Sequence, residues 1–257
     1  MLDAQQRTFW TRNGYLWLPG FLTADETAAV QSWTGEIMEW PDTPGKWMRY
    51  YERAQGRRLL ARIENFLPYH TGLQALFESG RIPALLEELL GEPAVVFKDK
   101  INLKAAGGQG FAPHQDGPAY VDFGLDFFVT VMVPVDPFTP ENGCLEMARE
   151  AATTRLLPHP GGALPPEIDA SYTYDPVLAS PGDVILFDSF VPHRSGPNRS
   201  GGPRRSYYVT YNRRSEGDHR AEYYARKRQL FPQECERVPG VDYARLGQQF
   251  NLANPFE

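Results

Sequence analysis

The chain of 257 residues is poor in cysteine and has no excess of positive charge, and each lack excludes a class of function. Its two cysteines, Cys144 and Cys235, are too few and too far apart for a disulfide framework or a thiolate zinc site. A net charge of −6 offers no basic surface for nucleic acid or an anionic membrane. No apolar run is long enough to span a membrane, and the N-terminus lacks a signal-peptide core. We therefore expect a soluble cytoplasmic protein with a small-molecule substrate.

The chain does contain 13% aromatic residues and 23 prolines, a composition that favours strands and firm turns over a helical bundle. The segment 157–167 is rich in proline and glycine, but it falls within a continuous series of strands and is predicted to be a loop. We therefore expect a single domain over 1–257. It would comprise a helical N-terminal part (about 1–92), a β core (about 93–215) and a C-terminal extension (216–257).

The N-terminal part is predicted to be helical with one strand, "YLWLPG". Thr23 and Glu26 have the spacing of a capping box, which marks the start of a helix, and Gly14 and Gly91 are placed to end two others. The expected helices lie at about 3–14, 23–40, 72–79 and 82–91.

From Pro93 onward the pattern becomes that of strands. "AVVFKDKINLK" (94–104) alternates, and each face of the expected strand has its own set of side chains. One face should carry Val96, Lys98, Lys100 and Asn102, and the other Phe97, Ile101 and Leu103. The short apolar runs "DFFVTVMVPVD", "CLEMA", "DVILFDSF" and "RRSYYVTYN" follow. Helices followed by many short strands predict a mainly β fold with flanking helices and a double-stranded β-helix (jelly-roll, cupin-like) core.

The stretch "FAPHQDG" suggests a metal site. On a strand, His114 and Asp116 point to the same side, so together they offer a nitrogen and an oxygen ligand. His193 ends an apolar strand and is the best candidate for a third ligand, because His159 and His219 lie in segments with no strand to hold them. Two histidines and one carboxylate form the facial triad of non-haem Fe(II) oxygenases. The alternative is a histidine at a strand end that only hydrogen-bonds to the aspartate.

An arginine shortly after His193 strengthens the oxygenase interpretation. An iron oxygenase with an oxoacid co-substrate needs a cation for the distal carboxylate, and the planar guanidinium group binds carboxylates through two hydrogen bonds. A turn through "SGPNRSGG" would return Arg204 to the metal, whereas Arg205 should point outward. The nearby aromatic residues Tyr120, Tyr207 and Tyr208 are expected in the core.

Four longer segments carry a family resemblance: "FWTRNGYLWLPGFLTADE", "FKDKINLKAAGGQGFAPHQD", "DPFTPENGCLE" and "PGDVILFDSFVPHRSGPNRSGGPRR". Together they resemble the phytanoyl-CoA dioxygenase (PhyH) family of Fe(II)/2-oxoglutarate oxygenases, near its ectoine hydroxylase and 2-aminoethylphosphonate dioxygenase-like members. The resemblance implies an enzyme that uses Fe(II), 2-oxoglutarate and O2. The residues that match the iron ligands are His114, Asp116 and His193. The residues that match positions around 2-oxoglutarate are Arg204 and Ser195 at the C5 carboxylate, Asn102 at the keto end, and Lys98, which serves either co-substrate or substrate.

The resemblance also guides the choice of reaction and substrate. A carboxylate at position 116, where related halogenases have a small residue, predicts hydroxylation of a C–H bond. The loop 147–167 and Met132 depart from the family pattern, so the substrate of phytanoyl-CoA hydroxylase does not transfer. "PGKWMRYYER", "RLLARIENF" and "YYARKRQLFP" resemble members that act on 2-aminoethylphosphonate. Lys98 and Lys100 would receive the phosphonate, and aromatic faces or Glu52 the ammonium group.

Other interpretations stay open at this point. Another amino acid, a betaine-like zwitterion or a secondary metabolite would also suit a small polar pocket. A non-oxidative cupin-like metal enzyme could use the same three metal ligands, and a binding module could keep the β core. Neither of these last two has a need for an arginine placed after the distal histidine.

Overall fold

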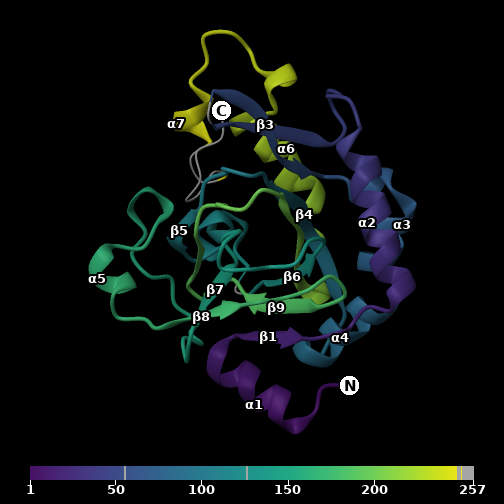
Figure 1. Cartoon of the computed structure of the whole chain (residues 1–257), viewed down its shortest axis with the longest axis vertical. Helices are drawn as coiled ribbons and strands as arrows, with labels where there is room; N and C mark the ends of the chain where they lie inside the picture. The colour runs from purple at the N-terminus through teal and green to yellow at the C-terminus, as the bar shows by residue number, and fades with distance from the viewer. Residues whose placement is uncertain (55, 126, 248–249, 251–257) are drawn as a thin grey trace.

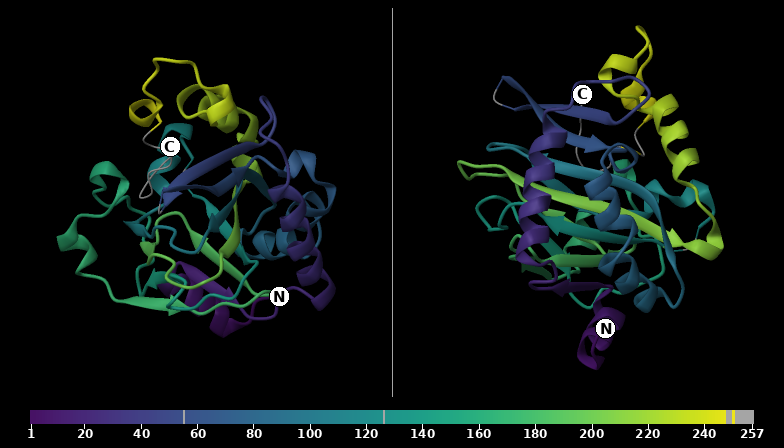
Figure 2. Two further views of the ribbon diagram at one scale, coloured as in Figure 1. Left: turned by 45° about the horizontal axis from the view of Figure 1, so that its top comes forward. Right: turned by 90° about the vertical axis from the view of Figure 1, so that its right-hand side faces the viewer.

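The computed structural model describes residues 1–54, 56–125, 127–247 and 250 (Figures 1 and 2). Two antiparallel sheets form its centre, one of seven strands in the order β1-β9-β6-β11-β4-β3-β2 and one of four in the order β5-β10-β7-β8. The strands are β1 Tyr15–Leu18, β2 Met48–Ala54, β3 Arg57–Glu64, β4 Ala94–Lys104, β5 Phe111–His114, β6 Val129–Pro134, β7 Leu145–Ala148, β8 Tyr174–Val177, β9 Val184–Asp188, β10 His193–Ser195 and β11 Arg204–Arg213. The prediction of a mainly β fold with flanking helices is confirmed.

The helices lie outside the sheets (Figure 1). They are α1 Ala4–Asn13, α2 Ala24–Met38, α3 Thr71–Glu78, α4 Arg81–Leu90, α5 Pro166–Asp169, α6 Arg220–Leu230 and α7 Tyr243–Leu246. The four helices expected before residue 92 are all present. Thr23 and Glu26 form the predicted capping box of α2, and Gly14 (φ 68°) and Gly91 (φ 77°) end α1 and α4 in the left-handed conformation.

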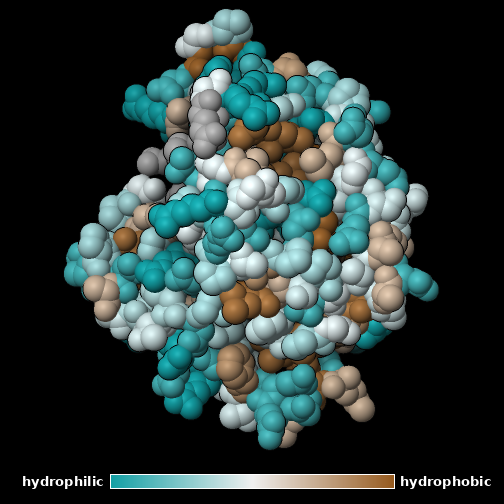
Figure 3. Space-filling view, in the orientation of Figure 1, coloured by the Kyte–Doolittle hydropathy of each residue, from teal (hydrophilic) through white to brown (hydrophobic). Residues whose placement is uncertain are grey.

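The largest part of the core lies between α2, α3, α4 and the seven-stranded sheet. Tyr207 of β11 is fully buried there, and its hydroxyl group lies 2.8 Å from the hydroxyl of Thr34 on α2. Each fully buried apolar side chain in such a layer contributes about 1.5–3 kcal/mol. The face in Figure 3 is mostly hydrophilic, with apolar residues in small separate patches. No helix among the described residues is both long and apolar enough to cross a membrane.

The segment 1–92 contains more β structure than expected. Besides β1, it supplies the β2–β3 hairpin, which extends the seven-stranded sheet at the edge beyond β4. The expectation of one strand was therefore wrong. The sequence of β3 did not indicate a strand with one buried face, because polar side chains such as Arg62 and Glu64 face a buried cavity rather than water.

Strand β4 carries most of the inner surface of the large sheet. Lys98, Lys100 and Asn102 face the cavity between the two sheets, as the alternation predicted. Ile101 and Leu103 point the other way and pack against the helices.

At the start of β4, the faces of two residues differ from the prediction. The register between β4 and β11 shifts so that Thr210 faces Lys98 and Tyr211 faces Val96, which leaves Phe97 as an extra residue. With one extra residue in the strand, the side chains beyond it point to the other face of the sheet. Val96 therefore joins the helix-facing core, and Phe97 joins a separate aromatic cluster, the reverse of the predicted faces.

Candidate active site

Three buried side chains converge inside the fold. His193 on β10 pairs directly with His114 on β5, and Asp116 follows the end of β5. One ligand atom from each of the three residues lies within 4.8 Å of the others. The sequence prediction that these residues meet at one point is confirmed. Two of the expected placements were wrong: Asp116 lies beyond β5 with helical backbone angles, and His193 begins β10 instead of ending an apolar strand.

The tautomer of each histidine is fixed by the backbone. Nδ1 of His114 donates a hydrogen bond to the carbonyl oxygen of Ala112 at 2.7 Å, and Nδ1 of His193 donates to that of Val191 at 3.0 Å. Because a carbonyl oxygen only accepts, the proton is on Nδ1 and each Nε2 keeps a free lone pair. This is the arrangement in which a histidine binds a metal while its other nitrogen is held by the protein.

Electrostatics keep the three groups in the form that binds a cation. Burial lowers the pKa of His114 to about 3, and His193 adds to the effect. Burial also lowers the pKa of His193. For Asp116, burial raises the pKa, but its electrostatic interactions with Lys100, His193 and Lys98 outweigh this effect, so the pKa lies below its usual range. Two neutral imidazoles and one carboxylate at neutral pH fit a divalent metal ion without proton release.

Gln115, between the histidine and the aspartate, holds the loop 147–167 next to this site. Its Oε1 accepts a hydrogen bond from the Leu157 amide at 2.7 Å. Its Nε2 donates to the carbonyl oxygens of Arg155 (3.1 Å) and Phe190. The segment 147–167, which departs from the family pattern, is thus attached directly to the metal site. Sequence reasoning missed Gln115, because a glutamine between two ligands carries no pattern of its own.

A buried guanidinium group lies at the far end of the inner sheet surface. Arg204, the first residue of β11, is 1% exposed, and its Nε and Nη1 have no hydrogen-bond partner among the described residues. Its guanidinium carbon lies 4.6 Å from the ring centre of Phe138. Leaving buried donors unpaired costs about 1–3 kcal/mol each. Unpaired donors on a buried guanidinium group therefore fit an anion, such as the distal carboxylate of 2-oxoglutarate.

Lys104 lies beside this arginine and was not singled out from the sequence. Its Nζ donates to Ser195 Oγ at 2.8 Å and to the carbonyl oxygen of Gly196 at 2.6 Å. Burial and the charge of Arg204 lower the pKa of Lys104 to about 6. Lys104 continues the alternation of Lys98, Lys100 and Asn102, so the pattern of the strand could have identified it. Ser195 contacts Lys104, which pairs with Arg204 across β4 and β11, and its role at the co-substrate stays a prediction.

The two remaining predictions about arginine and tyrosine residues have different outcomes. Arg205 points outward, as predicted, and forms an ion pair with Asp136 (2.7 Å). Tyr120 and Tyr207 are buried core residues, also as predicted. Tyr208 is buried too, but it lines the cavity, because it faces Lys100 across the β11–β4 pair.

The cavity in front of the three converging groups contains two lysines, Lys98 and Lys100, and we call it the chamber. Neither Lys98 nor Lys100 has a hydrogen-bond acceptor or an ion-pair partner in the part of the chain that the structure describes. Lys98 Nζ lies 4.5 Å from the ring centre of Tyr120, and Lys100 Nζ 5.2 Å from that of Tyr208. Burial lowers the pKa of both lysines, and the pKa of Lys98 falls well below its usual range. Both lysines can therefore bind a further acceptor, although the cavity also contains the carboxylates of Asp116 and Glu64.

The wall of the chamber next to β4 comes from β3 and α6. Glu64 of β3 accepts hydrogen bonds from Lys227 Nζ of α6 at 2.6 Å on each oxygen, and Arg62 Nη1 lies 3.4 Å away. Arg62 also donates to the Oδ1 of Asn102 at 2.9 Å, which ties this wall to the predicted co-substrate residue. Glu52, the expected partner of a substrate ammonium, is buried but does not line the chamber.

Comparison with known proteins agrees with this geometry. The family model of phytanoyl-CoA dioxygenase (PhyH) matches residues 10–206. The chain belongs to the PhyH family. It is 43% identical over 256 residues to a 2-aminoethylphosphonate dioxygenase of an uncultured bacterium (HF130_AEPn_1), with 98% of each chain covered. It is 42% identical over 233 residues to a methylphosphonate hydroxylase of Gimesia maris, with 90% of this chain and 89% of the relative covered.

The solved structures similar to this PhyH family member support the fold. EctD from S. alaskensis, solved with 2-oxoglutarate and 5-hydroxyectoine, has a TM-score of 0.73 and 22% identity, covering 84% of this chain and 77% of EctD. The double-stranded β-helix prediction is confirmed. This PhyH protein is an Fe(II)/2-oxoglutarate-dependent dioxygenase, as its relatives are. Helix α6 and its Lys227 lie beyond the matched residues 10–206.

Proposed function

We propose that this dioxygenase hydroxylates a C–H bond of a small organophosphonate such as 2-aminoethylphosphonate. The observation that carries the proposal is the pair of lysine ammonium groups, Lys98 and Lys100, that line the chamber without an acceptor. A phosphonate has several oxygens and up to two negative charges, so it can accept charge-assisted hydrogen bonds from both lysines at once.

The geometry of the site supports the proposed roles of the metal and co-substrate residues. Three residues would hold Fe(II), namely His114, Asp116 and His193. Four would hold 2-oxoglutarate, namely Arg204, Ser195, Lys104 and Asn102. When bound, iron and 2-oxoglutarate together supply the oxidising chemistry, with O2 consumed and succinate and CO2 released. The carboxylate of Asp116 occupies a ligand position that a halide would otherwise take, so the expected product carries a hydroxyl group.

The relatives support a phosphorus oxyanion as the substrate. Two of them are named for 2-aminoethylphosphonate and methylphosphonate, and a third, 28% identical, is a probable hypophosphite dioxygenase of Stutzerimonas stutzeri. An amino acid or a betaine-like zwitterion also has an anionic end, but a single carboxylate uses less of a site with two unpaired lysines. A non-oxidative cupin-like enzyme or a binding module gives no role to the unpaired donors of Arg204.

The same chamber argues for a single catalytic domain. Glu64 comes from 1–92, Lys98 and His193 come from 93–215, and Lys227 comes from the C-terminal extension. Side chains from all three predicted parts thus line one cavity. We keep a cytoplasmic location, and the absence of nucleic-acid and membrane partners, as predictions from composition and charge.

The proposal is tested by measuring succinate formation with Fe(II), O2 and 2-oxoglutarate, with and without each candidate substrate. We expect 2-aminoethylphosphonate to stimulate the rate above the substrate-free rate and to be recovered with one additional oxygen atom by mass spectrometry. Methylphosphonate and a panel of amino acids and betaines serve as comparisons. No stimulation by either phosphonate would overturn the proposal, and stimulation by an amino acid or betaine would then favour the alternative substrate.

A further inference from the structure

Glu64 occupies an unusual position for a carboxylate. It is 1% exposed, and it lies directly opposite Lys100 in the pairing of β3 with β4. Among the described residues that line the chamber, Glu64 and Asp116 are the acidic ones. Because Asp116 belongs to the metal site, Glu64 is the carboxylate available to a substrate.

The stability of the fold does not require a buried ion pair between Glu64 and Lys227. Both side chains are 1% exposed. Removing two charges from water costs several kcal/mol per ion, and apolar residues of the same volume often stabilise a protein as well or better. A buried ion pair in the wall of a cavity is thus better explained by recognition than by stability. Burial raises the pKa of Glu64, but Lys227 and Arg62 outweigh this and hold it below the usual range.

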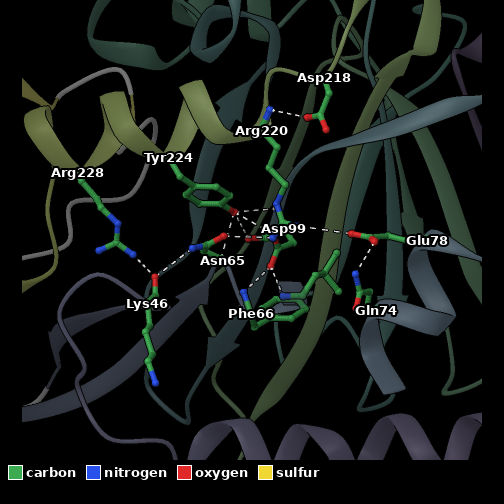
Figure 4. A network of polar contacts seen from close by, with 11 residues as sticks. Lys46, Asn65, Phe66, Gln74, Glu78, Asp99, Asp218, Arg220, Tyr224 and Arg228 are labelled. Atoms are coloured by element: carbon green, nitrogen blue, oxygen red, sulfur yellow. Dashed lines mark hydrogen bonds and ion pairs between the residues drawn. The ribbon is translucent and has the colours of Figure 1, made fainter. Parts of the chain in front are cut away.

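Helix α6 is fixed in place, so Lys227 holds Glu64 in one position. Figure 4 shows the contacts that attach the helix to β4. Asp99 of β4 is an ion-pair partner of Arg220, and its backbone amide donates to the hydroxyl of Tyr224 at 3.0 Å. Its carboxylate also accepts a hydrogen bond from the amide of Phe66 at 2.6 Å. The start of α6 and the end of β3 are therefore held against the strand that carries the two unpaired lysines.

The Glu64 carboxylate retains capacity to accept further hydrogen bonds. Two carboxylate oxygens have about four lone-pair positions, of which Lys227 uses one on each oxygen and Arg62 Nη1 a third at 3.4 Å. The side chains of directly opposed residues on neighbouring strands begin about 4.5–5.5 Å apart. A two-carbon linker can therefore connect a phosphonate at Lys100 to an ammonium group at Glu64. The ring of Tyr223, which also lines the chamber, adds an aromatic face suited to a cation.

We propose that Glu64, held by Lys227 and Arg62, is the specificity-determining residue that binds the ammonium group of an aminophosphonate. The inference rests on the proposed function, since it assumes that the phosphonate lies at Lys98 and Lys100. According to this inference, the β2–β3 hairpin and α6 discriminate between phosphonates with and without an amine. Helix α6 lies outside the residues matched by the family model.

The test compares 2-aminoethylphosphonate with propylphosphonate, which has a methyl group in place of the ammonium. In Glu64→Gln, kcat/KM for the amine should fall roughly ten- to a hundredfold, the effect of losing a hydrogen bond between charged groups. The value for propylphosphonate should stay unchanged or rise. Calorimetric affinities for both compounds, measured without O2 on protein loaded with Fe(II) and 2-oxoglutarate, should change in the same ratio. An equal loss for both compounds, or no change for either, overturns the inference.

Two further variants keep the result interpretable. Glu64→Gln leaves Lys227 without its partner, so the double variant Glu64→Gln/Lys227→Met, which leaves no unpaired charge, should show the same loss of amine preference. Asp136→Asn breaks an ion pair outside the chamber and should leave the preference as in the wild type. If the wild type turns over phosphonates and both Glu64 variants keep its preference for the amine, this inference alone is refuted. A wild type inactive on every phosphonate overturns the proposed function and the inference with it.

Discussion

His193 lies directly opposite His114 across the β10–β5 pair, with their ring centres 4.3 Å apart. The two rings are thus placed by the ladder of the small sheet rather than by a loop. Backbone carbonyls hold both rings through Nδ1, so the two Nε2 atoms need no reorganisation to meet a metal ion. A site held by strands in this way is rigid before any ligand arrives.

The first prediction concerns this pair. We expect His193→Ala to abolish substrate-stimulated succinate formation, because one of three metal ligands is lost. The weak visible band of the anaerobic Fe(II)–2-oxoglutarate complex should disappear as well. His159→Ala is the matched control, since that histidine lies in the loop 147–167 and its Nδ1 only donates to the carbonyl oxygen of Leu157. A band that persists in His193→Ala would show that the metal is bound elsewhere.

The second prediction concerns the buried guanidinium group. Arg204→Met should raise the KM for the co-substrate, 2-oxoglutarate, by at least about a hundredfold, because a charge-assisted pair of hydrogen bonds is lost. The same variant should be as stable as the wild type without ligand, or more stable, because unpaired buried donors are removed. It should also lose the rise in Tm that 2-oxoglutarate produces. Arg205→Met, next to it but facing outward, should keep the wild-type KM; an equal rise there would contradict the assignment.

The metal ligands and the arginine could be predicted because each belongs to a short local pattern next to a recognisable strand. His114 ends β5, His193 begins β10 and Arg204 begins β11, whereas Asp116 lies two residues beyond β5 with helical backbone angles, so the strand argument does not apply to it. The chamber wall could not be predicted in this way. Glu64 and Lys227 meet only because a hairpin and a distant helix pack on the same strand, and neither segment carries a pattern that refers to the other.

The faces of β4 show the same limit within one strand. Alternation correctly placed Lys98 and Lys100 inward, but it put Val96 and Phe97 on the wrong faces. An irregularity of one residue reverses every side chain beyond it. The shift depends on the pairing with β11, opposite Thr210, which the sequence of β4 does not contain.

The third prediction concerns Gln115 and the loop 147–167 that it holds next to the metal site. Gln115→Leu should lower the free energy of unfolding by about 1–3 kcal/mol, because the variant leaves the Leu157 amide and two carbonyl groups without their partner. Urea unfolding measures this effect. Activity should fall as well, since the loop 147–167 loses its attachment beside Asp116. Stability and activity both equal to those of the wild type would show that the loop is held by other contacts.

The fourth prediction separates the two roles open to Lys98, binding of substrate or of co-substrate. In Lys98→Met, the KM for the aminophosphonate should rise at least about tenfold, because one of two ammonium groups facing the phosphonate is lost. The KM for the co-substrate should change little, since Lys98 is three alternating positions from Lys104, which contacts Ser195. Lys46→Met, an exposed lysine, is the control. Steady-state rates with each compound varied in turn give both KM values. A rise confined to the co-substrate KM would assign Lys98 to 2-oxoglutarate and leave Lys100 as the phosphonate-binding lysine.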